Sequence, residues 1–173
     1  MMYFVDFDRT LFDTERFFAY LSTLSFFKDV YENSNGDKAS MVAHALQNPD
    51  FAFKKGELAP FLYEDAAAFL REKENSAMII TFGNPVFQKA KVVSAVDGIP
   101  RVQALYTGNV RKGEFIAPHL DMYGPTPTFI DDAPLELGIL NEHCPTARLF
   151  EMRRDGGEGS GDYTVIRSLR ELP

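Results

Sequence analysis

Five short apolar runs recur along the chain, separated by longer segments of mixed character. They are Met2–Val5, Ala77–Ile80, Val102–Tyr106, Thr128–Ile130 and Ala147–Met152. Each run has the length of a β-strand, and most lack the polar alternation of a strand with one face in water. Continuous apolar runs of this kind are typical of parallel strands that are covered on both faces. The pattern therefore predicts a parallel sheet of about five strands.

The segments between these runs show the spacing of helices. The expected helices are Glu64–Lys73, Pro85–Val96, Gly113–Leu120 and Pro134–Asn141. Strand and helix thus alternate, which is typical of α/β proteins with helices on both faces of a parallel sheet. We predict a three-layer, doubly wound, Rossmann-like α/β fold. After the last run we expect a flexible loop and a short helical turn, at Asp155–Gly161 and Ser168–Leu172.

The segment from residue 13 to residue 58 contains no strand-like run. Thr14 can cap a helix, and apolar residues follow it at helical spacing as far as Phe27. A loop is expected at Glu32–Lys38 and a second short helix at Ala39–Gln47. We therefore expect a small helical domain, residues 13–58, inserted into an α/β core made of residues 1–12 and 59–173. Its aromatic side chains are expected mostly to pack against one another, over the carboxyl end of the sheet.

Composition and charge narrow the class of protein. The chain has 173 residues, 45% of them hydrophobic, and a formal net charge of −7. The negative charge argues against nucleic-acid and anionic-membrane partners. The single cysteine, Cys144, cannot form an internal disulfide, and Asp6 and Asp8 interrupt any signal-peptide core. No apolar run approaches the roughly 20 residues that span a bilayer. A soluble cytoplasmic protein is expected, and the oligomeric state stays open.

Polar residues stand where three of the apolar runs end. Asp6 and Asp8 follow the first run, and Thr81 follows the second. The fourth run is followed by Asp131 and Asp132, and Lys112 lies about 20 residues earlier, just ahead of an expected helix. Because the carboxyl ends of parallel strands meet at one edge of a sheet, these side chains are expected to converge on one crevice.

The chemistry of this set indicates a phosphate site. Several carboxylates in one pocket need a cation, and oxygen ligands suit Mg²⁺. A metal ion, a lysine and a hydroxyl together can hold a phosphate group. One carboxylate can attack phosphorus, and a second can protonate the leaving oxygen and later activate water. Two neighbouring aspartates therefore have two separate tasks, and a metal would offset their repulsion.

The same residues carry a resemblance to a known family. Asp6-Phe7-Asp8-Arg9-Thr10 resembles the first motif, DxDxT, of the haloacid dehalogenase-like (HAD) hydrolases. Thr81 resembles their second motif and Lys112 their third. The pair Asp131-Asp132 resembles the fourth, with Glu136 four residues beyond Asp132. The motifs stand in the family's order over most of the chain, and the segment 13–58 resembles a small form of the family's helical cap.

The resemblance implies roles for the carboxylates. Asp6 would be the nucleophile and a magnesium ligand. Asp8 would be the general acid and base, and would bind the metal through its backbone carbonyl. Asp132 would bind the metal directly, and Asp131 directly or through water.

The remaining residues would hold the phosphate or support the site. By the resemblance, Thr81 and Lys112 would bind the phosphoryl group. Gly83 allows a tight turn beside them, and Asn84 could reach the substrate. Glu136 would support the metal ligands from behind.

Two further residues of the first motif are expected to support the structure of the site. We expect Thr10 to form local hydrogen bonds that shape the turn after the first strand. For Arg9 we favour a structural salt bridge over a contact with the substrate.

These observations lead to one hypothesis and several alternatives. The leading one is a Mg²⁺-dependent phosphatase that acts through an aspartyl-phosphate on a small phosphorylated metabolite. The presence of Asp8 favours a phosphatase over a dehalogenase in this family. The alternatives are a phosphoprotein or phosphopeptide phosphatase, a phosphotransferase, or a non-catalytic module that binds phosphate or metal. The sequence does not indicate which phosphate ester is the substrate.

Overall fold

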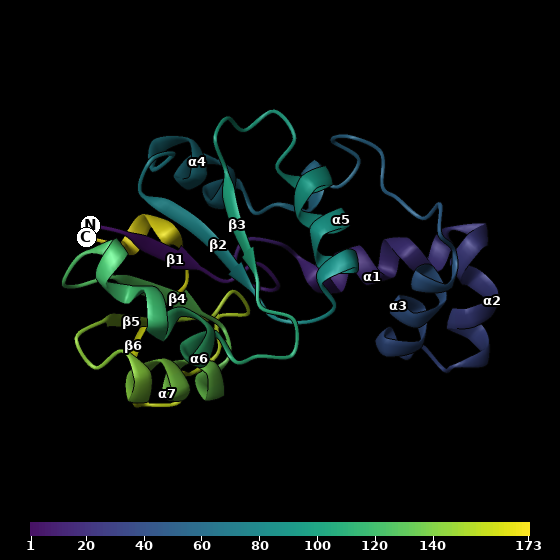
Figure 1. Cartoon of the computed structure of the whole chain (residues 1–173). Helices are drawn as coiled ribbons and strands as arrows, with labels where there is room; N and C mark the ends of the chain where they lie inside the picture. Colours follow the sequence, from purple (N-terminus) through teal and green to yellow (C-terminus); the bar gives the residue numbers. More distant parts are fainter.

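The computed structural model describes residues 1–173, and a parallel sheet of six strands forms its centre. The strand order is β3-β2-β1-β4-β5-β6, and every neighbouring pair is parallel. The strands are β1 (Tyr3–Val5), β2 (Ala77–Thr81), β3 (Gln103–Tyr106), β4 (Thr128–Asp131), β5 (Arg148–Met152) and β6 (Thr164–Ile166). The predicted doubly wound α/β architecture is confirmed (Figure 1).

The sixth strand was not predicted. β6 has only three residues, and it pairs with β5 alone at the edge of the sheet, where Thr164 is exposed. An edge strand this short does not need a continuous apolar run, so the pattern that revealed the other strands is missing. The helical turn predicted after it is present as the 3₁₀-helix η3 (Leu169–Glu171), which Ser168 caps.

Helices cover both faces of the sheet and form two apolar cores. α4 (Glu64–Glu72) and α5 (Pro85–Ala95) lie on one face, and α6 (Lys112–Ile116) and α7 (Pro134–His143) on the other (Figure 1). β1 contributes to both cores, because successive strand residues point to opposite faces. Tyr3 and Val5 belong to the larger core with α4 and α5, and Phe4 belongs to the smaller core with α6 and α7.

The region predicted as the helix Gly113–Leu120 has a different form. The α-helix α6 ends at Ile116, and a 3₁₀-helix, η2 (Ala117–Tyr123), continues the chain. Pro118 lacks the N–H group that a longer α-helix would need there. Gly113 allows α6 to pack closely on α7, since a Cβ atom at this position would lie 2.7 Å from the carbonyl oxygen of Ile139. This close contact fixes the start of α6, where Lys112 lies.

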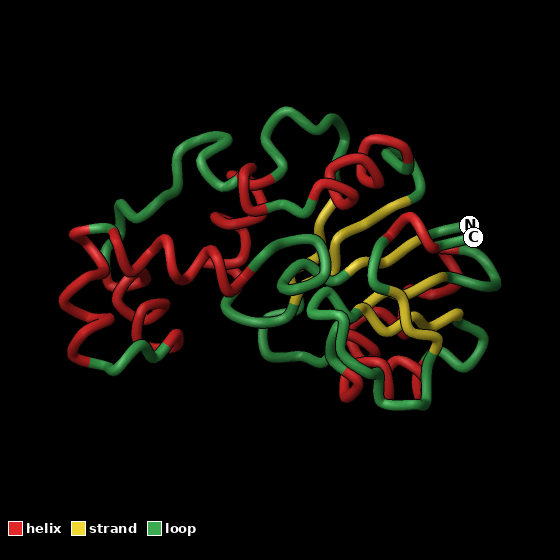
Figure 2. The backbone as a smooth tube through the Cα atoms, turned by 180° about the vertical axis from the view of Figure 1, so that it is seen from behind, coloured by secondary structure: helices red, strands yellow, loops and turns green.

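Residues 13–58 form a helical insert that projects from the sheet (Figures 1 and 2). It contains α1 (Thr14–Thr23), α2 (Ser25–Asn33) and α3 (Lys38–Gln47). The single helix expected from Thr14 to Phe27 is interrupted at Leu24, whose extended backbone has ψ 133°. The N-cap of α1 is Asp13 rather than Thr14, because the Asp13 carboxylate accepts a hydrogen bond from the Arg16 N–H.

Aromatic rings join the helical insert to the core. Phe51 stacks on Phe87 of α5, with ring centroids 6.0 Å apart, and also contacts Phe27 of α2. Phe17 of α1 is fully buried. Its ring packs edge to face on Phe53 and at a tilted angle on Phe87. These packed rings bear out the expectation that aromatic side chains of the insert lie mostly in the core. No helix of the chain is long and apolar enough to cross a bilayer.

Candidate active site

A buried cluster of charged side chains lies where β1, β4 and α6 meet. The Lys112 ammonium donates to Asp6 Oδ1 at 2.5 Å and to Asp131 Oδ2 at 2.6 Å. All three side chains are almost completely buried. β1 and β4 are neighbours in the sheet, with Val5 beside Ile130, and this pairing brings the two aspartates together at the strand ends. The predicted convergence of Asp6, Lys112 and Asp131 is therefore present.

The cluster carries more negative than positive charge. Carboxylate oxygens of Asp6, Asp131 and Asp132 lie within 4.8 Å of one another. Burial and the neighbouring carboxylates raise the pKa of Asp6 well above its ordinary value, although Lys112 opposes them. Burial and Asp131 raise the pKa of Asp132 to about 6. Asp131 and Asp6 raise the pKa of Lys112 against the effect of its burial, so it stays an ammonium. A second cation would relieve this repulsion.

The residues present fit a magnesium ion. The donors are carboxylate oxygens, which Mg²⁺ prefers in proteins. One of them, Asp6 Oδ2, is buried and has no hydrogen-bond partner. A buried carboxylate oxygen without a partner is costly, so it favours binding of a cation at this place.

The phosphate-binding residues predicted after β2 have different surroundings. Thr81 ends β2, which lies beside β1, and its buried hydroxyl has no hydrogen-bond partner. Gly83 has φ 116°, a conformation that side chains rarely allow. The Asn84 side chain caps α5, because its oxygen accepts from the N–H groups of Val86 and Phe87. Thr81 is thus free to bind a ligand, whereas the amide oxygen of Asn84 is already used.

Glu136 supports the lysine from α7. One of its carboxylate oxygens accepts from the Lys112 backbone N–H at 3.1 Å, and the other forms a 2.6 Å ion pair with Arg111. Arg111, the neighbour of Lys112 in the sequence, is therefore bound to Glu136 and lies outside the cluster. Asp131 Oδ1 accepts from the Ala133 N–H, which fixes the turn between β4 and α7.

Asp8 points to a second group of partners. Its oxygen Oδ1 lies 2.6 Å from the Lys91 ammonium and 2.7 Å from the Thr14 hydroxyl, and Oδ2 accepts from the Gln88 amide at 2.9 Å. Burial would raise the pKa of Asp8, but Lys91 and these hydrogen bonds lower it below its ordinary value. Asp8 is thus held as a carboxylate.

Sequence reasoning missed Lys91, although a signal was present. Lys91 is 2% exposed and lies on the buried face of α5 with Phe87, Val92 and Ala95. A lysine at a position where helical spacing demands an apolar residue indicates a buried partner of opposite charge. The ammonium lies 5.5–5.7 Å from the centroids of four phenylalanine rings, those of Phe7, Phe12, Phe17 and Phe87.

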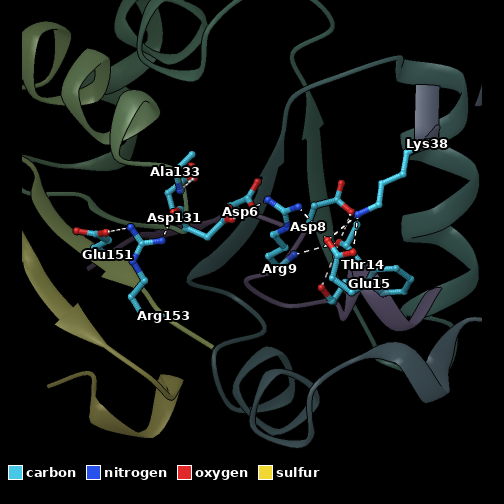
Figure 3. A network of polar contacts seen from close by, with 12 residues as sticks. Asp6, Asp8, Arg9, Thr14, Glu15, Lys38, Asp131, Ala133, Glu151 and Arg153 are labelled. Atoms are coloured by element: carbon cyan, nitrogen blue, oxygen red, sulfur yellow. Dashed lines mark hydrogen bonds and ion pairs between the residues drawn. The ribbon is translucent and has the colours of Figure 1, made fainter. Parts of the chain in front are cut away.

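Arg9 links the site to the helical insert (Figure 3). Its guanidinium donates to Glu15 of α1 at 2.9 Å, and Glu15 also binds Lys38 of α3 at 2.6 Å. The predicted salt bridge of Arg9 is present. Its Nη1 also lies 4.0 Å from Asp132 Oδ2.

The expectation for Thr10 was wrong. Its hydroxyl is buried and has no hydrogen-bond partner. The turn is instead held by Arg154, which donates two hydrogen bonds to the Thr10 carbonyl oxygen, at 2.8 and 3.0 Å. This arginine comes from the segment after β5, so the first motif alone gives no sign of the contact.

A cavity of about 400 Å³ opens beside Asp132. Its walls include the side chains of Arg9, Tyr63, Arg153 and Arg154. The three histidines, His44, His119 and His143, belong to different helices and none joins the carboxylate cluster. This cavity is thus lined by three arginines and an aromatic ring together with three acidic residues, Glu15, Asp132 and Asp155.

Comparison with known proteins rests on structure alone. No protein-family model matches the sequence, and no curated protein matches it significantly. Two solved structures with similar folds are candidate HAD hydrolases. One, from Burkholderia xenovorans LB400, has a TM-score of 0.62 and 16% identity, over 96% of this chain and 92% of the other. The other is YfnB from Bacillus subtilis, solved with bound magnesium. Its TM-score is 0.63 at 13% identity, over 99% of this chain and 96% of the other.

A third similar structure comes from Geobacter sulfurreducens PCA and is a HAD-superfamily hydrolase of subfamily IA, variant 1. It has a TM-score of 0.56 and 13% identity, over 99% of this chain and 93% of the other. The fold therefore agrees with the one that the four motifs implied. This chain has the fold of the haloacid dehalogenase-like hydrolases.

Proposed function

We propose that the protein is a Mg²⁺-dependent phosphatase that acts through an aspartyl-phosphate on a small phosphorylated metabolite. The observation that carries the proposal is the buried cluster of Asp6, Lys112 and Asp131, which has one carboxylate oxygen without a partner. The four sequence motifs and the fold shared with HAD hydrolases support it. YfnB, which has a similar fold, was solved with bound magnesium, and this supports a metal ion in the proposed reaction.

In the first step, an oxygen of the Asp6 carboxylate forms a bond to phosphorus, and the bond from phosphorus to the ester oxygen breaks. Lys112 and the free hydroxyl of Thr81 would bind the phosphoryl oxygens and stabilise their charge. When the leaving group needs a proton, Asp8 would first take one up from solvent and then give it to the departing oxygen; its lowered pKa makes this protonated form a minor one.

In the second step, Asp8 takes a proton from a water molecule that attacks the aspartyl-phosphate. The bond between phosphorus and Asp6 breaks, so inorganic phosphate leaves and the Asp6 carboxylate is restored. The ion pair with Lys91 holds Asp8 ionised, which is the state that accepts a proton. Magnesium would be held by Asp6, Asp131, Asp132 and the Asp8 carbonyl, and when bound it supplies positive charge to the phosphoryl group.

The size of the neighbouring cavity supports a small substrate. About 400 Å³ is within the range of pockets that bind small molecules. A small-molecule phosphate ester is therefore the proposed partner, with no role for nucleic acid or membrane. The single, buried cysteine is consistent with a cytoplasmic location, where thiols stay reduced.

The test is release of p-nitrophenol from p-nitrophenyl phosphate, whose leaving group departs without a proton. We expect hydrolysis by the wild type with Mg²⁺ and none with a chelator. Asp6→Asn should lower kcat by about a thousandfold or more, because an amide is a poor nucleophile. Circular dichroism should show that this variant stays folded.

Asp121→Asn is the matched control. Asp121 is exposed and lies on η2, at the end of the sheet away from the cluster. This variant also replaces an aspartate by an asparagine, and it should keep wild-type activity. Hydrolysis by Asp6→Asn at the wild-type rate would disprove the covalent mechanism. Absence of hydrolysis by folded wild type, with p-nitrophenyl phosphate and a panel of phosphate esters, would reject the phosphatase.

A further inference from the structure

We infer that the substrate carries a second anionic group, a carboxylate or another phosphate, and that Arg9 binds this group in the cavity beside Asp132. The inference rests on the proposed function for the place of the phosphoryl group, next to Asp6. It adds the chemical class of the substrate and a residue that determines specificity.

Two of the three arginines around the cavity are already engaged. Arg154 donates to Asp65 at 2.7 Å and twice to the Thr10 carbonyl oxygen. Arg153 forms an ion pair with the buried Glu151 and donates to the Asp132 carbonyl oxygen at 3.3 Å. Their donors are directed into the protein, so these two residues form the wall of the cavity rather than a binding group.

Arg9 differs from both of them. Its side chain is 58% exposed, and its only hydrogen bond goes from Nη2 to Glu15. Its Nη1 lies 4.0 Å from Asp132 Oδ2, which is too far for a hydrogen bond. The Nε and Nη1 donors of Arg9 therefore make no hydrogen bond. Each of them forms, together with Nη2, one of the two edges by which a guanidinium binds carboxylate or phosphate with two donors at once, so either edge can bind a group in the cavity when Arg9 turns from Glu15.

The partner of Arg9 does not depend on it. Glu15 binds the Lys38 ammonium through both carboxylate oxygens, each at 2.6 Å. Arg9, Glu15 and Lys38 together carry one positive charge, and Glu15 keeps an ion pair when Arg9 turns to a ligand (Figure 3). Two further acids line the cavity. Asp155 accepts a hydrogen bond from the Gly157 N–H in its own loop, and Asp132 is proposed to bind magnesium, which would offset its charge. Arg9 is therefore the charged group at this wall that is available to a ligand.

The backbone of Arg9 supports the inference only together with the position of its side chain at the cavity, since Asn35 and Arg101 also have positive φ. Arg9 has φ 61°, in the left-handed region that costs a non-glycine residue about 1 kcal/mol. Glycine adopts this conformation without that cost. Strained residues of this kind cluster at functional sites, where the side chain is needed. The Tyr63 ring, held by the Arg154 guanidinium 4.4 Å from its centroid, offers a flat wall for the body of the substrate.

The test compares the binding of two phosphonates that differ in one charge. The probes are 4-carboxybenzylphosphonate and its neutral isostere, 4-carbamoylbenzylphosphonate, each titrated calorimetrically into the protein with Mg²⁺. We expect the wild type to bind the carboxylate about tenfold more tightly, since a hydrogen bond between charged groups contributes about 1.5 kcal/mol or more. 1,4-Phenylene bisphosphonate then shows whether a second phosphate-like group is preferred to the carboxylate.

Arg9→Gly should remove the preference and bind both probes with similar affinity. Glycine relieves the strain at this position, so the variant is expected to fold. Arg101→Gly is the matched control, because Arg101 is also exposed, also has positive φ (56°), and lies before β3 at the opposite end of the sheet. It loses the same charge and should keep the preference.

The result separates this inference from the proposed function. Phosphonates are not hydrolysed, so their binding is measured whether or not the protein is a phosphatase. Equal binding of the three probes by the wild type, or an unchanged preference in Arg9→Gly, would overturn the inference. Failure of the proposed function would appear instead as absence of p-nitrophenyl phosphate hydrolysis.

Discussion

The lysine that faces Asp8 lies among apolar rings, and this surrounding determines how strongly the two charges interact. Lys91 is 2% exposed and the Asp8 side chain 27% exposed. Water therefore screens their attraction weakly, and each charge depends on the other. Phenylalanine faces add to the stabilisation of the ammonium, since ring faces carry negative charge.

We predict that Lys91→Met lowers the free energy of unfolding by about 2–3 kcal/mol, because it leaves the partly buried Asp8 carboxylate without its ion partner. Urea denaturation measures the change. The double variant Asp8→Asn/Lys91→Met should recover most of the loss, since methionine fits among the rings and asparagine carries no charge. If the losses of the single variants simply add in the double variant, the two residues are not coupled.

At the residue scale, sequence reasoning located the groups that follow the strands. Asp6, Asp131 and Lys112 were expected to meet because the ends of parallel strands are neighbours, and they do. The apolar face of α5 indicated that Lys91 is buried, and this signal was overlooked. The identity of its partner could not be predicted, because Asp8 lies 83 residues earlier and their contact depends on how α5 packs over β1.

The helical insert is held to the core by few elements. α3 and α5 contact each other, and Phe51 connects α2 with α5 through its stacked ring. The insert otherwise projects from the sheet (Figure 2). Phe51 is therefore one of the rings, with Phe17 and Phe53, whose packing on Phe87 stabilises the insert against the core.

We predict that Phe51→Ala speeds hydrogen exchange in α2 and α3 by about tenfold or more, because the loss of a partly buried ring lowers the local stability of the insert. The amides of β1, β2 and β4 should keep their protection. Mass spectrometry of peptic fragments measures both. Phe115→Ala, on α6 and outside this group of rings, serves as the control. A uniform increase over the whole chain in Phe51→Ala would instead show that insert and sheet unfold together.

Elements with a long periodic pattern were predicted well. α4, α5 and α7 lie where helical spacing placed them, within a few residues at their ends. Two incorrect predictions, a single helix through Leu24 and a sheet without β6, have local causes. Leu24 adopts an extended conformation between α1 and α2 that its apolar side chain does not signal, and β6 is too short and too exposed to show a run. At these positions, packing between elements determines the secondary structure more than the intrinsic propensity of the residues does.

The charge of the whole molecule adds to the local excess at the active site. The chain carries a formal net charge of −7, and three carboxylates share the cluster with a single lysine. A bound divalent cation therefore reduces the repulsion among the three carboxylates and also the negative charge of the whole chain. Protons compete with it, because Asp132 has a pKa of about 6 and a metal ligand must be deprotonated.

We predict that Mg²⁺ raises Tm by about 5–10 °C at pH 7 when its concentration is near 100 times Kd, and by less at pH 5. The folded-state pKa of Asp132 lies above its ordinary value, so the folded protein takes up a proton between pH 7 and pH 5 that metal must displace. Differential scanning calorimetry at the two pH values measures the increments. Asp132→Asn should show a small increment at both. Equal increments in the wild type at pH 5 and pH 7 would contradict the assignment of Asp132 as a ligand.

The position of β1 in the sheet has a consequence for synthesis of the chain. β1 is made before its two neighbours, because Val5 pairs with Ile79 and with Ile130. At 5–20 residues per second, about 6–25 seconds pass between translation of β1 and of β4. Until then β1 can pair only with β2, and its other edge stays unpaired. Asp6 is made early but can meet Asp131 only after β4 has been translated, so the buried charged cluster forms late in synthesis.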